Sequence, residues 1–551
     1  MKWRGNPWAV LVVVSLGFFM TLLDVTIVNI AIPDMMRRLN ASLDDALWVL
    51  NAYSLVLAVL VITAGRLGDL LGQRRLFAAG TAVFTLASAA CGFAPGPGWL
   101  IAFRAVQGLG AAMLMPQTLA LITMIFPADR RGAAFGVWGA VAGVATVAGP
   151  TLGGLLVTAL DWRWIFFVNL PIGAIVLVLS FVIVPNLRSG RRHRLDVPGV
   201  LIASAALLAI CYGLVEGQRY DWGRISGFIG IPAILAGGVI LLAAFLLYQR
   251  IRQAREPLVP FSLFRSRDYT LMSCVSGTLS VGMLGIFLPF TIYLQSALGF
   301  SALKAGLTMA PCSLMTMFVA PVAGRLTDRI GGKYILMTGL TLYAAGMGCA
   351  VLIATPASAW YDFLAPMIVA GVGMGSVFPP LTTVAMRDVD PRLAGAASGV
   401  LNTTRQVGSV IGIATVGALL QNRLASSLVH EATVRSAALP AGDRGPFISA
   451  FRAAAAAGLQ PGARAGVAAP RGTPAAVAAE LERLAMGTFA HGYVLAMRWT
   501  MVLPIAMVAL TALSCLAIRG RRYAAAVAGP EPRAAELVPR RSPEDLPVPA
   551  G

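Results

Sequence analysis

Long apolar stretches alternate with short polar turns from one end of the chain to the other. Each stretch holds about 20 residues with few charges, which is the length that an α-helix needs to cross a bilayer. The pattern predicts fourteen such spans, at 8–32, 46–64, 76–94, 99–125, 134–158, 164–184, 198–215, 226–248, 269–294, 303–323, 334–354, 362–386, 394–420 and 493–518. The strands of an outer-membrane barrel alternate in polarity over about ten residues, so unbroken runs exclude that class. The predicted fold class is therefore an all-α polytopic membrane protein.

One short phrase occurs twice between these spans. The first copy, GRLGDLLGQRR, begins at Gly65, and the second, GRLTDRIGGK, begins at Gly324, 259 positions later. A charged turn bounded by glycines and repeated between membrane spans indicates duplicated halves, as in many secondary transporters. Six spans with short loops take roughly 190 residues, so eight spans fit this separation better. Two extra spans, 198–215 and 226–248, are therefore predicted between two six-helix halves.

The arginines and lysines of the short loops predict the orientation. With the N-terminus inside, the inner short loops carry about three times as many of these residues as the outer ones. Cytoplasmic loops of membrane proteins show this bias. Both signature phrases and both chain termini are therefore predicted to face the cytoplasm, and the protein is expected in the cytoplasmic (inner) membrane.

The spans and the repeat together predict the domain layout. Its parts are an N-terminal half at 1–190, an inserted pair of helices with linkers at 191–260, a C-terminal half at 261–520 and a disordered cytoplasmic tail at 521–551. Within the C-terminal half, the segment at about 421–492 is rich in Ala, Gly and Pro, which predicts an external loop. Thr473 and Pro474 in that loop are typical of a helix start, so a short helix is expected to about Leu484.

Composition supports a membrane protein and narrows its partners. Hydrophobic residues make up 58% of the chain and charged residues 12%, with a mean hydropathy of +0.77. A soluble protein carries about a quarter charged residues. The net charge of +19 is expected in loops, where topology requires it, so nucleic acid is not a predicted partner. The six cysteines fall within apolar runs without C-x-x-C spacing, which predicts neither disulfides nor a zinc site. We expect a monomer that is surrounded by the lipid bilayer.

The motifs of ATP-driven and metal-dependent proteins are missing from the sequence. Gly332 and Lys333 are followed by Tyr334, so they do not complete the G-x-x-x-x-G-K-[ST] phosphate loop. The three histidines are isolated, with no H-E-x-x-H pattern, and stand at His193, His430 and His491. No catalytic constellation is present either. We therefore expect no cofactor, no metal and no enzymatic activity, and a proton gradient as the source of energy.

Two charged residues lie inside predicted spans of the N-terminal half. Asp24 belongs to LDVTIVNIAIP in the first span, and Arg104 belongs to RAVQGLG in the fourth. A charge inside the membrane costs about 2.5 kcal/mol or more, so it faces a partner or a water-filled path. Asp24 lies roughly 13 Å and Arg104 roughly 8 Å from the outer ends of their helices. The two are expected to meet directly or through a water, as either a proton-coupling pair or a static buried ion pair.

A polar stripe follows the thirteenth predicted span. Arg405 lies about eleven residues from its inner edge, close to the middle of the membrane. A second arginine at this depth indicates a cavity wall, and its acceptor is either a carboxylate or a substrate. The predicted substrate cavity is lined by Asn29, Gln107, Asn402, Arg405 and Gln406. The ninth and tenth spans hold no carboxylate, which favours neutral or singly charged substrates.

The two signature phrases are predicted to form a latch between the halves. Asp69 stands just before a helix N-terminus, which favours a carboxylate, and Arg130 or Arg131 of the next inner loop is its expected partner. Such pairs open and close during alternating access, although topology alone also places arginine in short loops. The predicted latch residues are Gly65, Asp69, Gly72, Arg74, Arg130, Gly324, Asp328 and Gly332.

The fifth predicted span is rich in glycine and contains one proline. Small residues let helices approach closely in any membrane protein, and a Gly-Pro step bends a helix. A bend is therefore predicted at four residues, which are Gly149, Pro150, Gly153 and Gly154.

Taken together, these motifs resemble those of the major facilitator superfamily. The signature phrases resemble the family's loop between its second and third helices, and LDVTIVNIAIP and RAVQGLG resemble its first-helix and fourth-helix motifs. The glycines and proline of the fifth span resemble the motif of exporters. The 6 + 2 + 6 layout is similar to that of the fourteen-helix drug:proton antiporters. Leu70 and Gln73 depart from the family's pattern, which predicts a weaker latch.

The resemblance implies a major facilitator fold and a proton-coupled exporter. It would exchange protons for drugs or other amphipathic or apolar small molecules by alternating access, with Asp24 and Arg104 carrying the proton. Antibiotic resistance through multidrug efflux is the expected outcome. A dedicated exporter of a single metabolite, amino acid or lipid is the alternative. Where the host has an outer membrane, a periplasmic adaptor protein is a further candidate partner.

Overall fold

A computed structural model describes most of the chain. Its described residues are 5–41, 43–186, 196–217, 219–220, 222–226, 229–253, 257–437, 439, 441–456 and 475–518. Thirteen helices among them are long and apolar enough to cross a membrane. A further helix coincides with the remaining predicted span at 134–158, and the count of fourteen membrane spans stays a prediction. The predicted tail at 521–551 and the predicted helix start at Thr473 and Pro474 lie outside the described residues.

The N-terminal half consists of long helices joined by short turns. They are α1 (Pro7–Leu39), α2 (Leu43–Leu71), α3 (Gln73–Gly92), α4 (Pro97–Ile125), α5 (Arg131–Ala159), α6 (Trp164–Phe167) and α7 (Asn169–Val182), with a 3-10 turn, η1 (Ala128–Arg130), before α5. The sequence sets several of these limits locally. The Asn6 side chain accepts hydrogen bonds from the first backbone N–H groups of α1, and Asn40 ends that helix in the left-handed conformation, with φ 48°.

The inserted pair and the C-terminal half follow the same pattern. The inserted helices are α8 (Val197–Glu216) and α9 (Ile231–Ile251), joined by an antiparallel pair of short strands, β1 (Arg224–Ser226) and β2 (Ile229–Gly230). The C-terminal half comprises η3 (Phe261–Arg265), α10 (Arg267–Ile292), η4 (Tyr293–Ala297), α11 (Ala302–Ile330), α12 (Gly332–Ile353), η5 (Trp360–Phe363), α13 (Leu364–Gly375), α14 (Phe378–Met386), η6 (Pro391–Leu393), α15 (Ala394–Ser436), α16 (Ala441–Ala456), α17 (Ala475–Ser514) and η7 (Cys515–Ala517). The span predicted at 362–386 is divided at Val377, because Pro379 and Pro380 lack the N–H groups that would continue the helix.

The two halves repeat one turn geometry at the signature phrases. Gly72 separates α2 from α3 with φ 95°, and Gly331 separates α11 from α12 with φ 89°. Only glycine adopts these backbone angles without strain. The turn glycine of the second copy is thus Gly331, one residue before the predicted Gly332, which instead packs inside the half against Pro380 and Val384.

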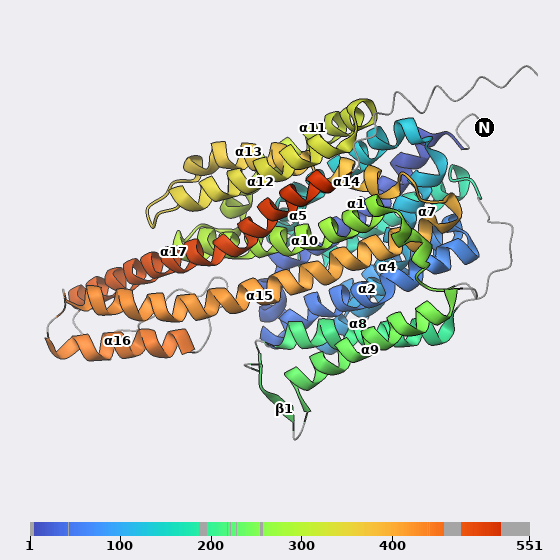
Figure 1. Cartoon of the computed structure of the whole chain (residues 1–551). Coiled ribbons are helices and arrows are strands. Elements are labelled where there is room, and N and C mark those ends of the chain that lie inside the picture. The colour runs from blue at the N-terminus through green and yellow to red at the C-terminus, as the bar shows by residue number, and fades with distance from the viewer. Residues whose placement is uncertain are drawn as a thin grey trace, which may run out of the picture.

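The segment that was predicted as an external loop is largely helical where it is described. α15 continues to Ser436, α16 packs beside it, and α17 runs unbroken past Leu484, where a short helix was expected to end. Figure 1 shows α15, α16 and α17 extending beyond the other helices at one end of the molecule. Leu424 and Leu428 recur at helical spacing and are buried in the cluster that holds Phe447 of α16. This apolar stripe explains why the helices continue.

Glycines bring the two halves into direct contact. α2 packs against α15, and α5 packs against α11. A Cβ atom on Gly65 would lie 2.8 Å from the Cα of Gly399, and one on Gly324 would lie 2.9 Å from the Cα of Gly136. Gly65 and Gly324 hold the same position in the repeated phrase, so the two contacts are equivalent. Both lie on the face of the molecule that carries the signature phrases, which we name the loop face.

The inserted pair lies beside the two halves. α8 contacts α2 and α15, α9 packs on α8, and Figure 1 shows both at the edge of the bundle. Asp196 caps α8 and accepts hydrogen bonds from Tyr248, at 2.9 Å, and from Gln249, at 2.7 Å, near the end of α9. These bonds fix the pair as one unit beside the two halves.

The packing of α3 against α4 gives a test of the fold. A Cβ atom on Gly110 would lie 2.5 Å from the backbone nitrogen of Phe84, so Gly110→Val must push the two helices apart. Overpacking of this kind costs about 1 to 3 kcal/mol. We expect the melting temperature of the detergent-purified protein to fall by several degrees. Gly348→Val on α12 is the control, because nothing lies within 4 Å of that position. Equal melting temperatures for the two variants would contradict the described packing.

Candidate functional site

Asp24 lies at the centre of a closed polar cluster in the N-terminal half. Its Oδ2 accepts a short hydrogen bond from Nη1 of Arg104 on α4. Its Oδ1 accepts from Nε2 of Gln107 at 2.8 Å and from Nδ2 of Asn169 at 3.3 Å. Asp24 is 0% exposed and Arg104 is 1% exposed. The two charges that were expected to meet are therefore in direct contact, without an intervening water.

Further contacts hold the Arg104 guanidinium in place. Its Nε donates to the carbonyl of Val49 on α2 at 3.0 Å, and its Nη1 donates to Oε1 of Gln107 at 2.7 Å. The ring of Tyr53 lies beneath it, with 4.4 Å between the guanidinium carbon and the ring centroid. Cation and carboxylate thus satisfy each other in a site closed to water. Gln107, which was predicted to line the substrate cavity, belongs to this cluster instead, because its amide bridges the two charges.

Two members of the cluster were missed from the sequence. Asn169 of α7 donates to Asp24 and, at 3.1 Å, to Oγ of Ser88 on α3, and Ser88 donates to the carbonyl of Phe166 at 2.9 Å. Asn169 is the only amide side chain in the apolar run 164–184, and this isolation was the available signal. A serine such as Ser88 gives no signal, because serine is frequent in membrane helices.

The aspartates of the signature phrases each bind a helix of the opposite half. The Asp69 oxygens accept hydrogen bonds from the backbone nitrogens of Gly395, at 2.9 Å, and Ala396, at 2.8 Å, in the first turn of α15. The Asp328 oxygens accept from Gly132, at 2.7 Å, and Ala133, at 2.8 Å, in the first turn of α5. The first N–H groups of a helix have no acceptor within it and carry partial positive charge, so each site suits a carboxylate.

The partners expected for Asp69 were wrong. The Arg130 side chain is 69% exposed and approaches only Asp129, at 3.9 Å, among the described ion pairs. Arg131 donates to backbone carbonyls, one of which belongs to Met386 of the opposite half. Two backbone N–H groups in fixed positions hold a carboxylate with less loss of side-chain freedom than an arginine on an exposed loop does.

Two other residues of the first phrase act within their own half. Arg74 donates to the carbonyl of Val184 at 3.2 Å and lies over the ring of Phe181. It thus ties α3 to the end of α7, and none of its contacts with described residues joins the halves. Gln73, a departure from the family's pattern, donates to Oδ1 of Asp69 at 3.1 Å. It thereby adds a donor at the carboxylate, and the strength of the latch stays a prediction.

The glycine-rich helix α5 touches the Asp24 region. A Cβ atom on Gly149 would collide with the side chain of Thr26 on α1, whose hydroxyl donates to the carbonyl of Ala145 at 3.4 Å. α5 runs unbroken past Gly149 and Pro150, and open space surrounds the position of Gly154. The close contact with α1 explains Gly149, whereas the bend predicted here, which also involves Gly153, stays a prediction.

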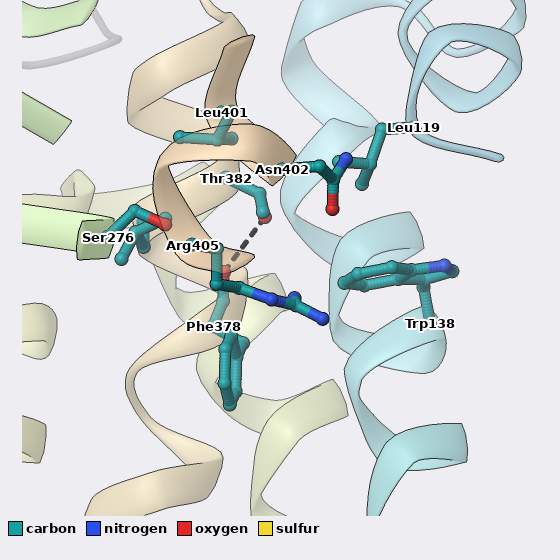
Figure 2. Close-up of a pocket in the computed structure, with 9 residues that line it drawn as sticks. Leu119, Trp138, Ser276, Phe378, Thr382, Leu401, Asn402 and Arg405 are labelled. Carbon is teal, nitrogen blue, oxygen red and sulfur yellow. Dashed lines mark hydrogen bonds between the residues drawn. The ribbon is translucent and has the colours of Figure 1, made fainter. Parts of the chain in front are cut away.

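A small pocket lies between the halves (Figure 2). It is lined by Leu119 of α4, Trp138 of α5, Ser276 of α10, Phe378, Leu381 and Thr382 of α14, and Leu401, Asn402 and Arg405 of α15. Its cavity volume is about 10 Å³, which is about the space that one water needs. A larger guest fits only when the halves move apart.

Two of the five residues predicted to line a substrate cavity are found in this pocket. These are Asn402 and Arg405. Asn29 is exposed and donates to the carbonyl of Val25 on its own helix at 2.7 Å. Gln406 follows Arg405 on α15 but is not among the lining residues, because successive residues of a helix point about 100° apart.

Comparison with known proteins shows which family has this fold. A family model described as the Major Facilitator Superfamily matches residues 14–413. The chain belongs to the major facilitator superfamily. It is therefore a multi-pass membrane transporter, and its relatives put it in the drug-efflux branch of that superfamily.

Two of these relatives and one solved structure show the extent of the likeness. The tetracenomycin C resistance and export protein of Streptomyces glaucescens is 34% identical over 557 residues, which cover 99% of this chain and 95% of that protein. The multidrug resistance protein Stp of Mycobacterium tuberculosis is 36% identical over 419 residues, covering 76% of each. The structure of a human organic anion transporter has a TM-score of 0.57 at 12% identity, covering 91% of this chain and 99% of its own. That last likeness concerns the fold alone.

The charge pair in this major facilitator transporter gives a prediction about stability. Arg104→Met leaves the Asp24 carboxylate buried without its cation, which costs about 3 to 5 kcal/mol. We expect a lower melting temperature, partly restored in the double variant Asp24→Asn/Arg104→Met, in which no charge remains. Arg130→Met, at an exposed position, serves as the control. If the falls in stability of the single variants Asp24→Asn and Arg104→Met simply add in the double variant, the two groups do not interact as described.

The Asp69 contact gives a prediction about conformation. Spin labels at Leu71→Cys and Arg392→Cys flank the Asp69 site on opposite halves, in a background where the exposed Cys274 and Cys349 are serine. Hydrogen bonds to a charged group contribute about 1.5 to 3 kcal/mol. Asp69→Asn should therefore raise the ratio of separated to closed labels about tenfold or more.

The readout is the distance distribution from pulsed electron paramagnetic resonance. The matched control for Asp69→Asn is Asp388→Asn, because the Asp388 side chain is 61% exposed and contacts Arg387 of its own half. Identical distributions in the wild-type and Asp69→Asn proteins would show that this carboxylate does not hold the loop face closed.

Proposed function

We propose that this transporter exports drugs or other amphipathic small molecules in exchange for protons. Its relatives are named for resistance and export and for multidrug resistance, and this transporter would move its cargo in the same outward direction. The single observation that carries proton coupling is the Asp24 cluster. A carboxylate that is 0% exposed beside a permanent cation changes its contacts when it gains a proton.

Protonation of Asp24 would weaken the interactions that hold the cluster together. The neutral acid no longer attracts Arg104 as an ion and keeps only a weaker, neutral acceptor oxygen, while the guanidinium retains its bonds to Gln107 and Val49. α1 and α4 then lose their strongest mutual contact. Protonation therefore favours the state in which these helices separate, since a bound proton stabilises whichever state binds it more tightly.

One helix connects the cluster to the latch. Two residues beyond Asp24, Thr26 of α1 packs into α5 at Ala145 and Gly149. The first turn of the same α5 holds Asp328 of the opposite half. A shift of α1 is thus passed along a rigid helix to a contact between the halves, and this contiguous route is the basis of the proposed coupling.

The hydrogen bonds between the halves indicate which conformational state the structure represents. Six described hydrogen bonds join the halves, and all lie toward the loop face: those of Asp69, of Asp328, of Arg131 to Met386 and of Ser398 to Pro116. The charge bias of the loops assigns that face to the cytoplasm. We therefore interpret the structure as closed toward the cytoplasm, and cargo loading requires these bonds to open.

One proton that moves inward across 100 mV supplies about 2.3 kcal/mol, before any pH gradient is counted. This is the driving force that the proposed exchange would use for export.

Two possibilities exist for the range of compounds that the transporter exports. A multidrug pump and a dedicated exporter of one metabolite, amino acid or lipid would use the same coupling site. Growth of a pump-deficient host on a panel of toxic compounds separates them, because a dedicated exporter protects against few. A periplasmic adaptor remains a candidate partner only in a host that has an outer membrane.

The coupling proposal predicts the behaviour of Asp24→Asn. In everted vesicles with an imposed proton gradient, we expect this variant to lose dye accumulation and the linked proton release. Gradient-free dye exchange should persist, because it needs cargo binding and helix movement but no change in proton occupancy. The dye is one that the wild-type protein transports in an uncoupler-sensitive way. Asp388→Asn is the matched control and should transport normally. Gradient-driven accumulation at the wild-type rate in Asp24→Asn would sink the proposal.

A further inference from the structure

Arg405 places a positive charge between the two halves at mid-depth. It stands eleven residues into α15 from Ala394, or roughly 16 Å along the helix axis. Figure 2 shows its guanidinium projecting across the pocket toward Trp138, which belongs to the opposite half. The guanidinium carbon lies over the ring of Phe378, 5.9 Å from the ring centroid. An arginine stays charged at this depth and needs an acceptor.

The protein provides no carboxylate for Arg405 among its described residues. The five helices that line the pocket are α4, α5, α10, α14 and α15, and together they contain two acids. Asp268 pairs with Arg387 at 2.6 Å, and Glu431 pairs with Arg435 at 3.2 Å. Asp24, which is 0% exposed in the N-terminal half, is enclosed by its own cluster.

The remaining lining of the pocket is mostly apolar. Trp138 is 3% exposed and stacks on Phe18, with 4.2 Å between the ring centroids. Phe378 and three leucines complete the apolar wall, and the polar groups beside Arg405 are Ser276, Thr382 and Asn402. The Thr382 hydroxyl already donates to the carbonyl of Phe378 at 2.8 Å, and the Asn402 amide donates to that of Ser398 at 3.0 Å. Neither supplies a formal negative charge.

We propose that Arg405 is the anchor for a negatively charged group of the cargo, and that the cargo class is the amphipathic aromatic anion. A carboxylate, sulfonate or ionised phenol would meet the guanidinium, and its rings would lie against Trp138 and Phe378. The inference rests on the proposed function, because it names the substrate class of the same transporter. Of the two acceptors that the sequence left open for Arg405, the ion pairs of the lining helices favour the substrate over a carboxylate of the protein.

Closure of the halves would strengthen this contact. Leu119 and Trp138 come from the N-terminal half, and the other lining residues come from the C-terminal half. A cavity of about 10 Å³ is too small for aromatic cargo, so binding takes place in a state with the halves further apart. As they approach, water leaves the site, and the attraction between guanidinium and anion grows as the local dielectric constant falls.

The charge of two matched dyes tests the proposal. Fluorescein is anionic and rhodamine 123 is cationic, and both share the xanthene ring system. Their equilibrium binding to the purified full-length transporter is measured by fluorescence anisotropy, without a proton gradient. We expect the wild-type protein to bind fluorescein at least tenfold more tightly than rhodamine 123. Arg405→Gln should weaken fluorescein binding tenfold or more and leave rhodamine 123 unchanged or tighter.

Two further variants control for loss of structure. Arg405→Lys keeps the charge and should bind fluorescein within about threefold of wild type. Arg130→Gln removes an arginine that is 69% exposed and should have no effect. The proposal is overturned if the wild-type protein binds both dyes equally, or if Arg405→Gln weakens both dyes to the same degree, as a packing role would. Gradient-driven export of rhodamine 123 without fluorescein binding would also overturn it, and would leave the proposed proton-coupled export intact.

Discussion

The contact between the Asp24 carboxylate and the Arg104 guanidinium is the interaction on which the N-terminal half depends. Neither charge is stable alone in a medium of low dielectric constant, so each recruits the other and every nearby dipole. The amides of Gln107 and Asn169 and the carbonyl of Val49 join α4, α7 and α2 to α1 around a single carboxylate. A change in its charge therefore acts on four helices at once, which makes the site suited to a switch.

The two halves contact each other through the aspartates of the repeated phrase. Asp69 binds the first turn of α15, and Asp328 binds the first turn of α5. Each half supplies one carboxylate and one helix N-terminus, so the two contacts are reciprocal, as expected of repeats that face each other. Glycines beside both sites let the backbones approach. α5 is the shared element, because its first turn belongs to the latch and its middle packs on α1 next to Asp24.

Charge is distributed unequally between the two halves. Asp24 of the N-terminal half is buried among the helices of that half, whereas Arg405 of the C-terminal half faces the pocket between the halves. Proton and cargo would then occupy different places. Exchange of one for the other would run through the movement of α1, α4 and α5, and would not require direct competition for one side chain.

The sequence by itself determined the helical membrane class, the approximate positions of thirteen spans and the repeated phrase, because bilayer thickness and a local repeat can be read along the chain. It also singled out Asp24, Arg104 and Arg405, since a charge in an apolar run is visible without a structure. Only the tertiary structure decided the partners. Asn169 joined the Asp24 cluster, Asp69 bound backbone N–H groups of the opposite half in place of Arg130 or Arg131, and the predicted external loop became an extension of α15. Each of these outcomes depends on which helices lie side by side, and the hydropathy of a single helix does not carry that information.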